Sequence, residues 1–87
     1  ASLLQAILFS NNDFLYQNIQ AGANQLLAQH HGDVQLSMNA LYQNALGRLP
    51  TEKEKDLVNK QLKTATKETV IEDLVWSVLA LPEFQFL

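Results

Sequence analysis

Apolar residues recur at intervals of three or four along nearly the whole chain of 87 residues, and no alternation of apolar and polar residues bounded by hairpin turns is present. Intervals of three and four place side chains on one face of an α-helix, whereas alternation is the pattern of a half-buried strand. The spacing therefore predicts an all-α protein. Because a chain of this length buries one modest core, we expect a single domain over residues 1–87.

Turn and capping residues divide the chain into a short opening helix and four longer ones. Gly32 and Gly47 suit the left-handed conformation that ends a helix, and Asp33 suits the N-cap that begins the next one. We expect the opening helix over Ser2–Phe9, a turn and N-cap from Ser10, Asn11 and Asn12, and main helices over residues 13–29, 34–46, 52–64 and 67–81. The predicted architecture is a small bundle of four main helices plus the short N-terminal helix.

Each main helix carries an apolar stripe that predicts its buried face. In chain order the stripes consist of Leu15, Ile19, Ala23 and Leu26, flanked by Tyr16 and Leu27; of Val34, Met38, Leu41, Ala45 and Leu46; of Leu57, Val58 and Leu62; and of Val70, Ile71, Leu74, Val75, Val78 and Leu79. The third stripe is narrow, which predicts a helix at the surface. The fourth is the widest, which predicts the central helix of the bundle.

The stretch LYQNALGRLPTEKE, Leu41–Glu54, holds the end of one helix, a turn and the start of another. Gly47 ends the first helix, and Pro50 cannot continue it because proline lacks the backbone N–H. Thr51 with Glu54 three residues later forms the pattern of a capping box, which begins a helix. We therefore expect a structural corner formed by Gly47, Arg48, Pro50, Thr51 and Glu54.

Arg48 is expected to fasten this corner. A helix leaves its last carbonyl groups without partners, and a guanidinium group pairs well with carbonyls and carboxylates. The expected partners are those carbonyls or a carboxylate such as Glu83 or Glu72. Binding of an anionic ligand by Arg48 is the alternative.

Three motifs occur in the order AILFSNNDFLYQ, ALYQNALGRLPTEKE and VWSVLALPEFQFL. Together they resemble the C-terminal domain of unknown function of large secreted planctomycete-type proteins, whose parent chains also carry cytochrome c-like modules and, often, carbohydrate-binding-like modules. The matching positions are Asn12, Phe14 and Gln17, then Tyr42, Leu46, Gly47, Arg48, Pro50 and Thr51, then Glu83 and Phe84. Leu81 and Pro82 depart from the commonest form of that family. The Leu-Gly-Arg-x-Pro corner and the terminal Pro-Glu-Phe also occur in other secreted bacterial helical domains and in cyanobacterial linker domains.

The resemblance implies an extracytoplasmic location, periplasmic or secreted, and membership of a multidomain protein. It brings no catalytic residues. The apolar residues at both ends, Leu3 and Leu87, agree with a domain excised from a larger parent chain.

Charge and cysteine content exclude several kinds of site. The formal net charge of −3 gives no long-range attraction to nucleic acid or to anionic membrane surfaces. The opening LLQAILF is too short to span a bilayer, so we expect no membrane insertion. There is no cysteine to act as nucleophile or metal ligand. His30 and His31 diverge on a helix and have no second ligand cluster, so they are interpreted as residues at a helix C-terminus, and we expect no metal and no cofactor.

The carboxylates Glu68, Glu72 and Asp73 lie on one short helical surface rather than on two facing walls of a cleft, as a glycosidase pair would. Negative charge near a helix start is favourable in itself. No set of nucleophile, base and oxyanion donors is recognisable, so the sequence predicts a protein that is not an enzyme.

Charge is unevenly distributed along the chain. All six basic residues lie between Arg48 and Lys67, interleaved with acidic ones, which is typical of a solvated helix face, with a docking face as the alternative. Residues 1–47 contain no Lys or Arg and only Asp13 and Asp33 as acidic residues, with amides as the other polar groups. Such a surface is typical of an interdomain contact, although amide-rich solvent faces also occur.

Three aromatic residues are candidates for contact with a partner: Trp76, Tyr42 and Phe84. Trp76 is expected either to pack in the core or to be an exposed anchor, with core packing favoured. The predicted function is a non-catalytic scaffold or interaction module whose partners are other domains of the same parent chain or another protein. A carbohydrate-related binding module and an accessory part of an enzyme are the alternatives.

Overall fold

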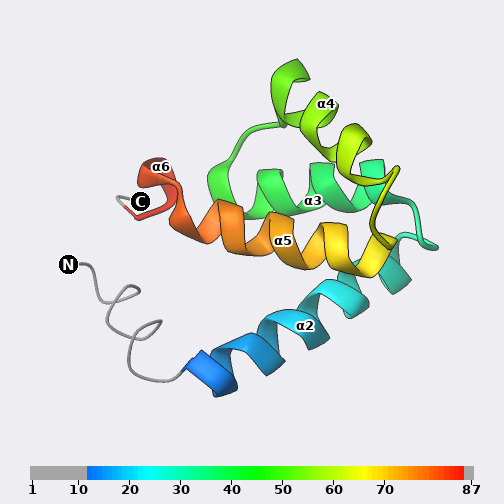
Figure 1. Ribbon diagram of the computed structural model, residues 1–87. Helices are drawn as coiled ribbons and strands as arrows, with labels where there is room; N and C mark the ends of the chain where they lie inside the picture. Colours follow the sequence, from blue (N-terminus) through cyan, green and yellow to red (C-terminus); the bar gives the residue numbers. More distant parts are fainter. Residues whose placement is uncertain (1–11, 86–87) are drawn as a thin grey trace.

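The computed structural model describes residues 12–85, and all regular structure in this range is helical (Figure 1). The elements are α2 (Asn12–Gln29), α3 (Val34–Leu46), α4 (Glu52–Gln61), α5 (Lys67–Ala80) and α6 (Pro82–Gln85). The predicted all-α bundle with four main helices is confirmed. The expected opening helix, Ser2–Phe9, lies outside the described residues.

The helix ends follow local rules that the sequence carries. Asp33 caps α3 by accepting a hydrogen bond from the backbone N–H of Leu36 at 3.0 Å. Gly47 ends α3 with φ 70°. Thr51 and Glu54 form both bonds of the capping box at the start of α4. These three predictions are confirmed.

Other boundaries agree only in part with those predicted. Gly32 is left-handed and α5 begins at Lys67 as expected, whereas α4 ends at Gln61 rather than at residue 64 and α5 ends at Ala80 rather than at residue 81. After α2, His31 joins Gly32 in the left-handed region, with φ 57° and 77°. Thr66 is the N-cap of α5, and its hydroxyl accepts from the backbone N–H of Thr69. Asn12, expected to cap α2, is its first helical residue. A short helix, α6, follows α5 directly, because Pro82 suits the first turn of a new helix but cannot continue the old one.

Helix α5 lies at the centre of the described fold and packs against α2, α3 and α6, as Figure 1 shows. The prediction of a central helix over this segment is confirmed. The core combines residues from four helices: Ala23, Leu27, Val34, Met38, Tyr42, Val58, Val70, Ile71, Leu74 and Val78.

On two helices the observed buried face is rotated about the helix axis relative to the predicted one. On α2, Ile19, Ala23 and Leu27 are buried and Leu26 is half-buried, so the core contact runs along Leu27 rather than Leu26. On α3, Tyr42 is buried at 3% exposure, whereas Leu41 is half-buried. The side chains of Leu15 and Tyr16 lie outside the described set.

Helix α4 is the least closely packed of the four main helices. Its only buried residue is Val58, and Leu57, predicted to belong to the apolar stripe, is 58% exposed. Two side-chain hydrogen bonds tie α4 to its neighbours. Gln35 Nε2 donates to Asn59 Oδ1 at 2.9 Å, and Gln61 Nε2 donates to Asp73 Oδ2 at 2.6 Å. Helix α4 therefore stands partly away from α5.

Candidate functional site

Arg48 connects the corner after α3 to both α4 and α6. Its Nε and Nη2 donate to the two carboxylate oxygens of Glu83 at 3.0 and 2.7 Å. Its Nη1 and Nη2 donate to the two oxygens of Glu54 at 2.9 and 3.2 Å, and Nη1 also donates to the carbonyl of Leu49 at 3.0 Å. The predicted pairing with Glu83 is confirmed, whereas Glu72 is not a partner. These bonds use all five N–H donors of a guanidinium group, which leaves none for an anionic ligand.

The electrostatics of this cluster fix its protonation states. The guanidinium carbon of Arg48 lies 5.3 Å from the ring centroid of Tyr42, within the range of a cation–π contact. Hydrogen bonds from Arg48 lower the pKa of Glu54 to about 2 and also lower the pKa of Glu83. Burial, followed by the negative charge of Glu54, raises the pKa of Tyr42. Glu54 is therefore ionised at neutral pH and cannot serve as a proton donor.

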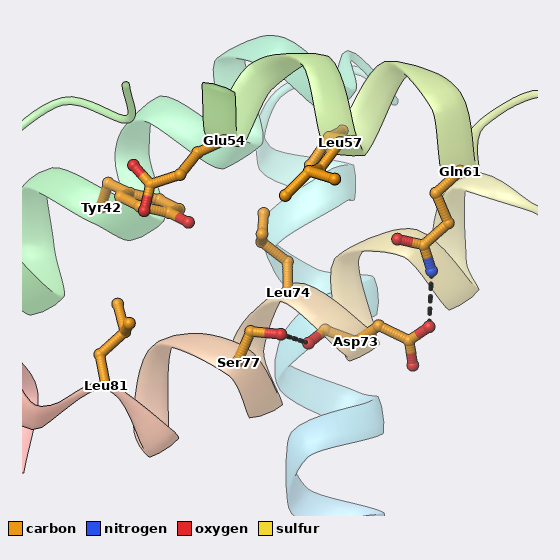
Figure 2. Close-up of a pocket in the computed structure, with 9 residues that line it drawn as sticks. Tyr42, Glu54, Leu57, Gln61, Asp73, Leu74, Ser77 and Leu81 are labelled. Atoms are coloured by element: carbon orange, nitrogen blue, oxygen red, sulfur yellow. Dashed lines mark hydrogen bonds between the residues drawn. The ribbon is translucent and has the colours of Figure 1, made fainter. Parts of the chain in front are cut away.

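A wedge-shaped cavity of about 310 Å³ opens between α4 and α5 (Figure 2). Its apolar lining comes from Tyr42, Leu57, Val58, Leu74 and Leu81, and its polar lining from Glu54, Gln61, Asp73 and Ser77. We call this cavity the α4–α5 wedge. It exists because α4 buries only Val58 and so does not close against α5.

The polar groups of the wedge come from both helices, Glu54 and Gln61 from α4 and Asp73 and Ser77 from α5. Figure 2 shows the amide of Gln61 donating to one carboxylate oxygen of Asp73, while the second oxygen points away from Gln61. The hydroxyl of Ser77 donates to the backbone carbonyl of Asp73 at 2.9 Å. The proton of the Ser77 hydroxyl is engaged by this carbonyl of its own helix, so the hydroxyl is not activated as a nucleophile in this arrangement.

Sequence reasoning missed the wedge. Its signal is present as two pairs of residues four apart, Leu57 with Gln61 on α4 and Asp73 with Ser77 on α5. Residues four apart share a helix face, but a sequence does not show which faces meet. The way α4 crosses α5 is decided by tertiary packing and cannot be read from either helix alone.

A second cavity, of about 350 Å³, lies beside α2. It is almost wholly apolar and is lined from α2, α3 and α5 by Asn18, Ile19, Gly22, Ala23, Leu26, Leu41 and Val75. Beside it, the solvent-exposed residues of α2 between Gln17 and Gln29 are all uncharged: Gln17, Asn18, Gln20, Ala21, Gly22, Asn24, Gln25, Ala28 and Gln29. We call this surface the uncharged face of α2.

The three aromatic residues proposed for partner contact have different environments. Tyr42 is in the core, and the guanidinium group of Arg48 lies over its ring. The ring therefore offers almost no surface to a partner. Phe84 packs against the core from α6. Trp76 is half-buried, so its exposure is intermediate between that of a core residue and that of an exposed anchor.

The histidine considered as a metal ligand, His30, and the carboxylates Asp73 and Glu68 lie in different parts of the described fold. His30 Nδ1 is 2.8 Å from the carbonyl oxygen of Leu26, which is the helix-terminal role expected of it. Among the residues that the structure describes, no group of three or more His, Asp or Glu side chains could hold a metal ion. Asp73 lines the wedge, whereas Glu68 lines a different cavity between α2 and α5.

None of the described helices combines the length and apolar character needed to cross a membrane. Comparison of the chain with models of protein families, with curated proteins and with solved structures gave no match. Function is therefore inferred from the geometry of the chain itself.

Proposed function

We propose that this domain is a non-catalytic scaffold or interaction module of a secreted multidomain bacterial protein, and that it docks another domain of the same parent chain. The observation that supports this proposal is the uncharged face of α2. Surfaces that lose water on association are depleted of charged residues, whereas solvated faces carry them. Exposed Lys53, Asp56 and Lys60 on α4 provide the contrast within the same protein.

The cavity beside α2 adds apolar area to this surface. Leu26, Leu41 and Val75 are half-buried and line it from three different helices. A partner domain lying on the uncharged face of α2 would cover these side chains as well. Such an arrangement has an apolar centre and an amide rim, which is the common anatomy of a protein interface.

The two alternatives receive less support. A carbohydrate-binding module uses exposed aromatic rings along its groove, whereas the α2 cavity has an aliphatic lining and the ring of Tyr42 at the wedge is 3% exposed. An accessory role beside catalytic residues elsewhere in the parent chain predicts a concentration of carboxylates at the docking surface, and the exposed residues of α2 between Gln17 and Gln29 include none. Glu54 is the counter-ion of Arg48, with a pKa of about 2.

The test is a binding measurement between this domain and the remainder of its parent chain by isothermal titration calorimetry. The variant Ala21→Glu/Ala28→Glu places two charges on the uncharged face of α2 without losing helix propensity. We expect it to bind at least about tenfold more weakly, since unpaired charges are costly to desolvate.

The matched control, Lys53→Ala/Lys60→Ala, makes the net charge more negative by the same amount on the exposed side of α4 and should bind within about twofold of the wild type. An equal loss in both variants would show that only net charge matters. Absence of binding by the wild-type domain would overturn the docking proposal.

A further inference from the structure

We propose that the α4–α5 wedge is a second binding site, which takes a peptide segment of a partner protein presenting one large apolar side chain next to a lysine or arginine. This inference rests on the proposed function as an interaction module and names a partner chemistry for a different surface from the uncharged face of α2.

The shape of the wedge suits a single inserted side chain. Its floor is formed by Val58 and Leu74, which are 3% and 8% exposed. Its volume of about 310 Å³ is at the small end of the range for ligand pockets. A whole helix face would not enter a cavity of this size, whereas one leucine or phenylalanine side chain would.

Leu57 gives the wedge an apolar rim that solvent reaches. It is the most exposed large hydrophobic residue that the structure describes, at 58%, and Figure 2 shows its side chain directed towards Leu74. An apolar side chain inserted beside Leu57 and above the already buried Leu74 would remove the exposed part of Leu57 from water. This burial would provide the main driving force for binding.

The charge of the wall selects a cationic neighbour for that side chain. Of the described residues that line the wedge, Glu54 and Asp73 are acidic and none is basic. Glu54 is already neutralised by Arg48. Asp73 binds Gln61 through Oδ2 only and is exposed, so its Oδ1 is available to accept from a lysine or arginine.

The experiment is a titration of the ¹⁵N-labelled 87-residue chain, followed by two-dimensional NMR. The three titrants are tripeptides acetylated at the N-terminus and amidated at the C-terminus: Lys-Leu-Lys, Gln-Leu-Gln and Lys-Gln-Lys. We expect the first to shift backbone amides around Leu57, Gln61, Asp73 and Ser77. The second lacks the cations and should bind about threefold to fivefold more weakly, the scale of one exposed ion pair. The third lacks the apolar side chain and should cause no shifts in the wedge.

Variants of the wall and rim separate the two contributions. Asp73→Asn keeps an acceptor for Gln61 and removes the charge, so the two leucine-containing peptides should bind equally. Leu57→Ser should abolish binding of both. The matched control Asp56→Asn removes a carboxylate from the exposed side of α4 and should leave the preference for the lysine-containing peptide intact.

Several outcomes would overturn the proposal. One is equal binding of the leucine-containing peptides to the wild type, and another is a set of shifts confined to residues outside the wedge. A third is the appearance of the same shifts when the protein alone is concentrated, which would assign the wedge to self-association. Ala21→Glu/Ala28→Glu should leave peptide binding unchanged, so failure of the wedge proposal is distinguishable from failure of docking through α2.

Discussion

At the scale of single residues, Arg48 joins the corner after α3 to α4 and α6. It lies between Gly47, which ends α3, and the turn that leads to α4, and it also binds Glu83 in α6, 35 positions away. The planar guanidinium allows two bidentate carboxylate contacts and a stacked tyrosine at once, which a lysine could not provide. The corner is thus held by side-chain geometry as well as by backbone turns.

Replacement of this residue, Arg48→Ala, is expected to lower the free energy of unfolding by about 1–2 kcal/mol, because the partly exposed ion pairs are lost and Glu54 is left half-buried without its counter-ion. Urea unfolding monitored by circular dichroism measures this. Lys53→Ala on the exposed side of α4 is the control and should change stability by less than about 0.5 kcal/mol. Equal stability of both variants would contradict a structural role for Arg48.

The same cluster predicts a pH dependence of stability. Glu54 and Glu83 have lower pKa values in the folded protein than the ordinary value of 4.5, and the pKa of Glu54 is about 2. The unfolded chain therefore binds more protons than the folded protein as the pH falls through about 4.5 towards 2, and stability decreases over that range. Unfolding midpoints in urea at pH 7, 5 and 3 measure the decrease.

Glu54→Gln tests the assignment of this pH dependence. The variant should be less stable than the wild type at pH 7 and should lose less stability between pH 5 and pH 3, since one of the two titrating groups is removed. An unchanged decrease in the variant would mean that other carboxylates are responsible.

At the scale of helices, the sequence predicted what depends on local chemistry. The caps at Asp33, Gly47 and Thr51 are confirmed because a few neighbouring residues decide them. The burial of Tyr42 and the exposure of Leu57 were not predicted. Both depend on how α4 crosses α3 and α5, which an apolar stripe does not specify.

The limits of prediction at the candidate sites have the same origin. Arg48 was expected to pair with Glu83, with Glu72 or with the last carbonyls of α3, because a helix end needs partners and arginine favours carboxylates; Glu83 is a partner. The second carboxylate, Glu54, was not predicted as a partner. The wedge was missed because it is a gap between two helices, and each of its walls belongs to a different segment. The sequence showed that the first half of the chain has few charged residues, but only the structure shows which of the uncharged residues of α2 are exposed.

Two glycines in the same fold should respond to alanine in opposite directions. Gly47 has φ 70°, so Gly47→Ala is expected to cost about 1–2 kcal/mol of stability through backbone strain alone, because no atom lies within 4 Å of the added methyl group. Gly22 is in the interior of α2, where the added methyl group also meets nothing within 4 Å. Gly22→Ala should therefore stabilise the protein by about 0.5–1 kcal/mol.

Thermal and urea unfolding of the two variants provide the measurement. Each glycine variant is the control for the other, since both changes add one methyl group at an open position. Destabilisation of similar size in both would contradict the assignment of the Gly47 effect to its left-handed backbone.

At the scale of the whole molecule, packing is uneven around the central helix. Helices α2 and α3 share an extensive apolar contact with α5, whereas α4 contributes Val58 and relies on polar contacts elsewhere. The opening of a part of a protein costs less free energy when that part buries few apolar side chains. We therefore expect α4 to open separately from the rest.

Native-state hydrogen exchange tests this expectation. Backbone amides of α4 should exchange with a lower opening free energy than those of α5, and Arg48→Ala should lower the value for α4 further while changing α5 less. A single opening free energy shared by α4 and α5 would contradict the prediction. In that case the wedge would be a rigid feature of the fold.

The pairing of Arg48 with Glu83 also connects α6 to the rest of the described fold, so it lies on the path of any mechanical force applied at α6. Tension applied at α6 acts first on Glu83 and on the packing of Phe84, before it reaches the buried residues of α5. The guanidinium passes part of that load to the start of α4 through Glu54. We therefore expect that pulling on the C-terminal end of the described fold detaches α6 before it disturbs the hydrophobic core.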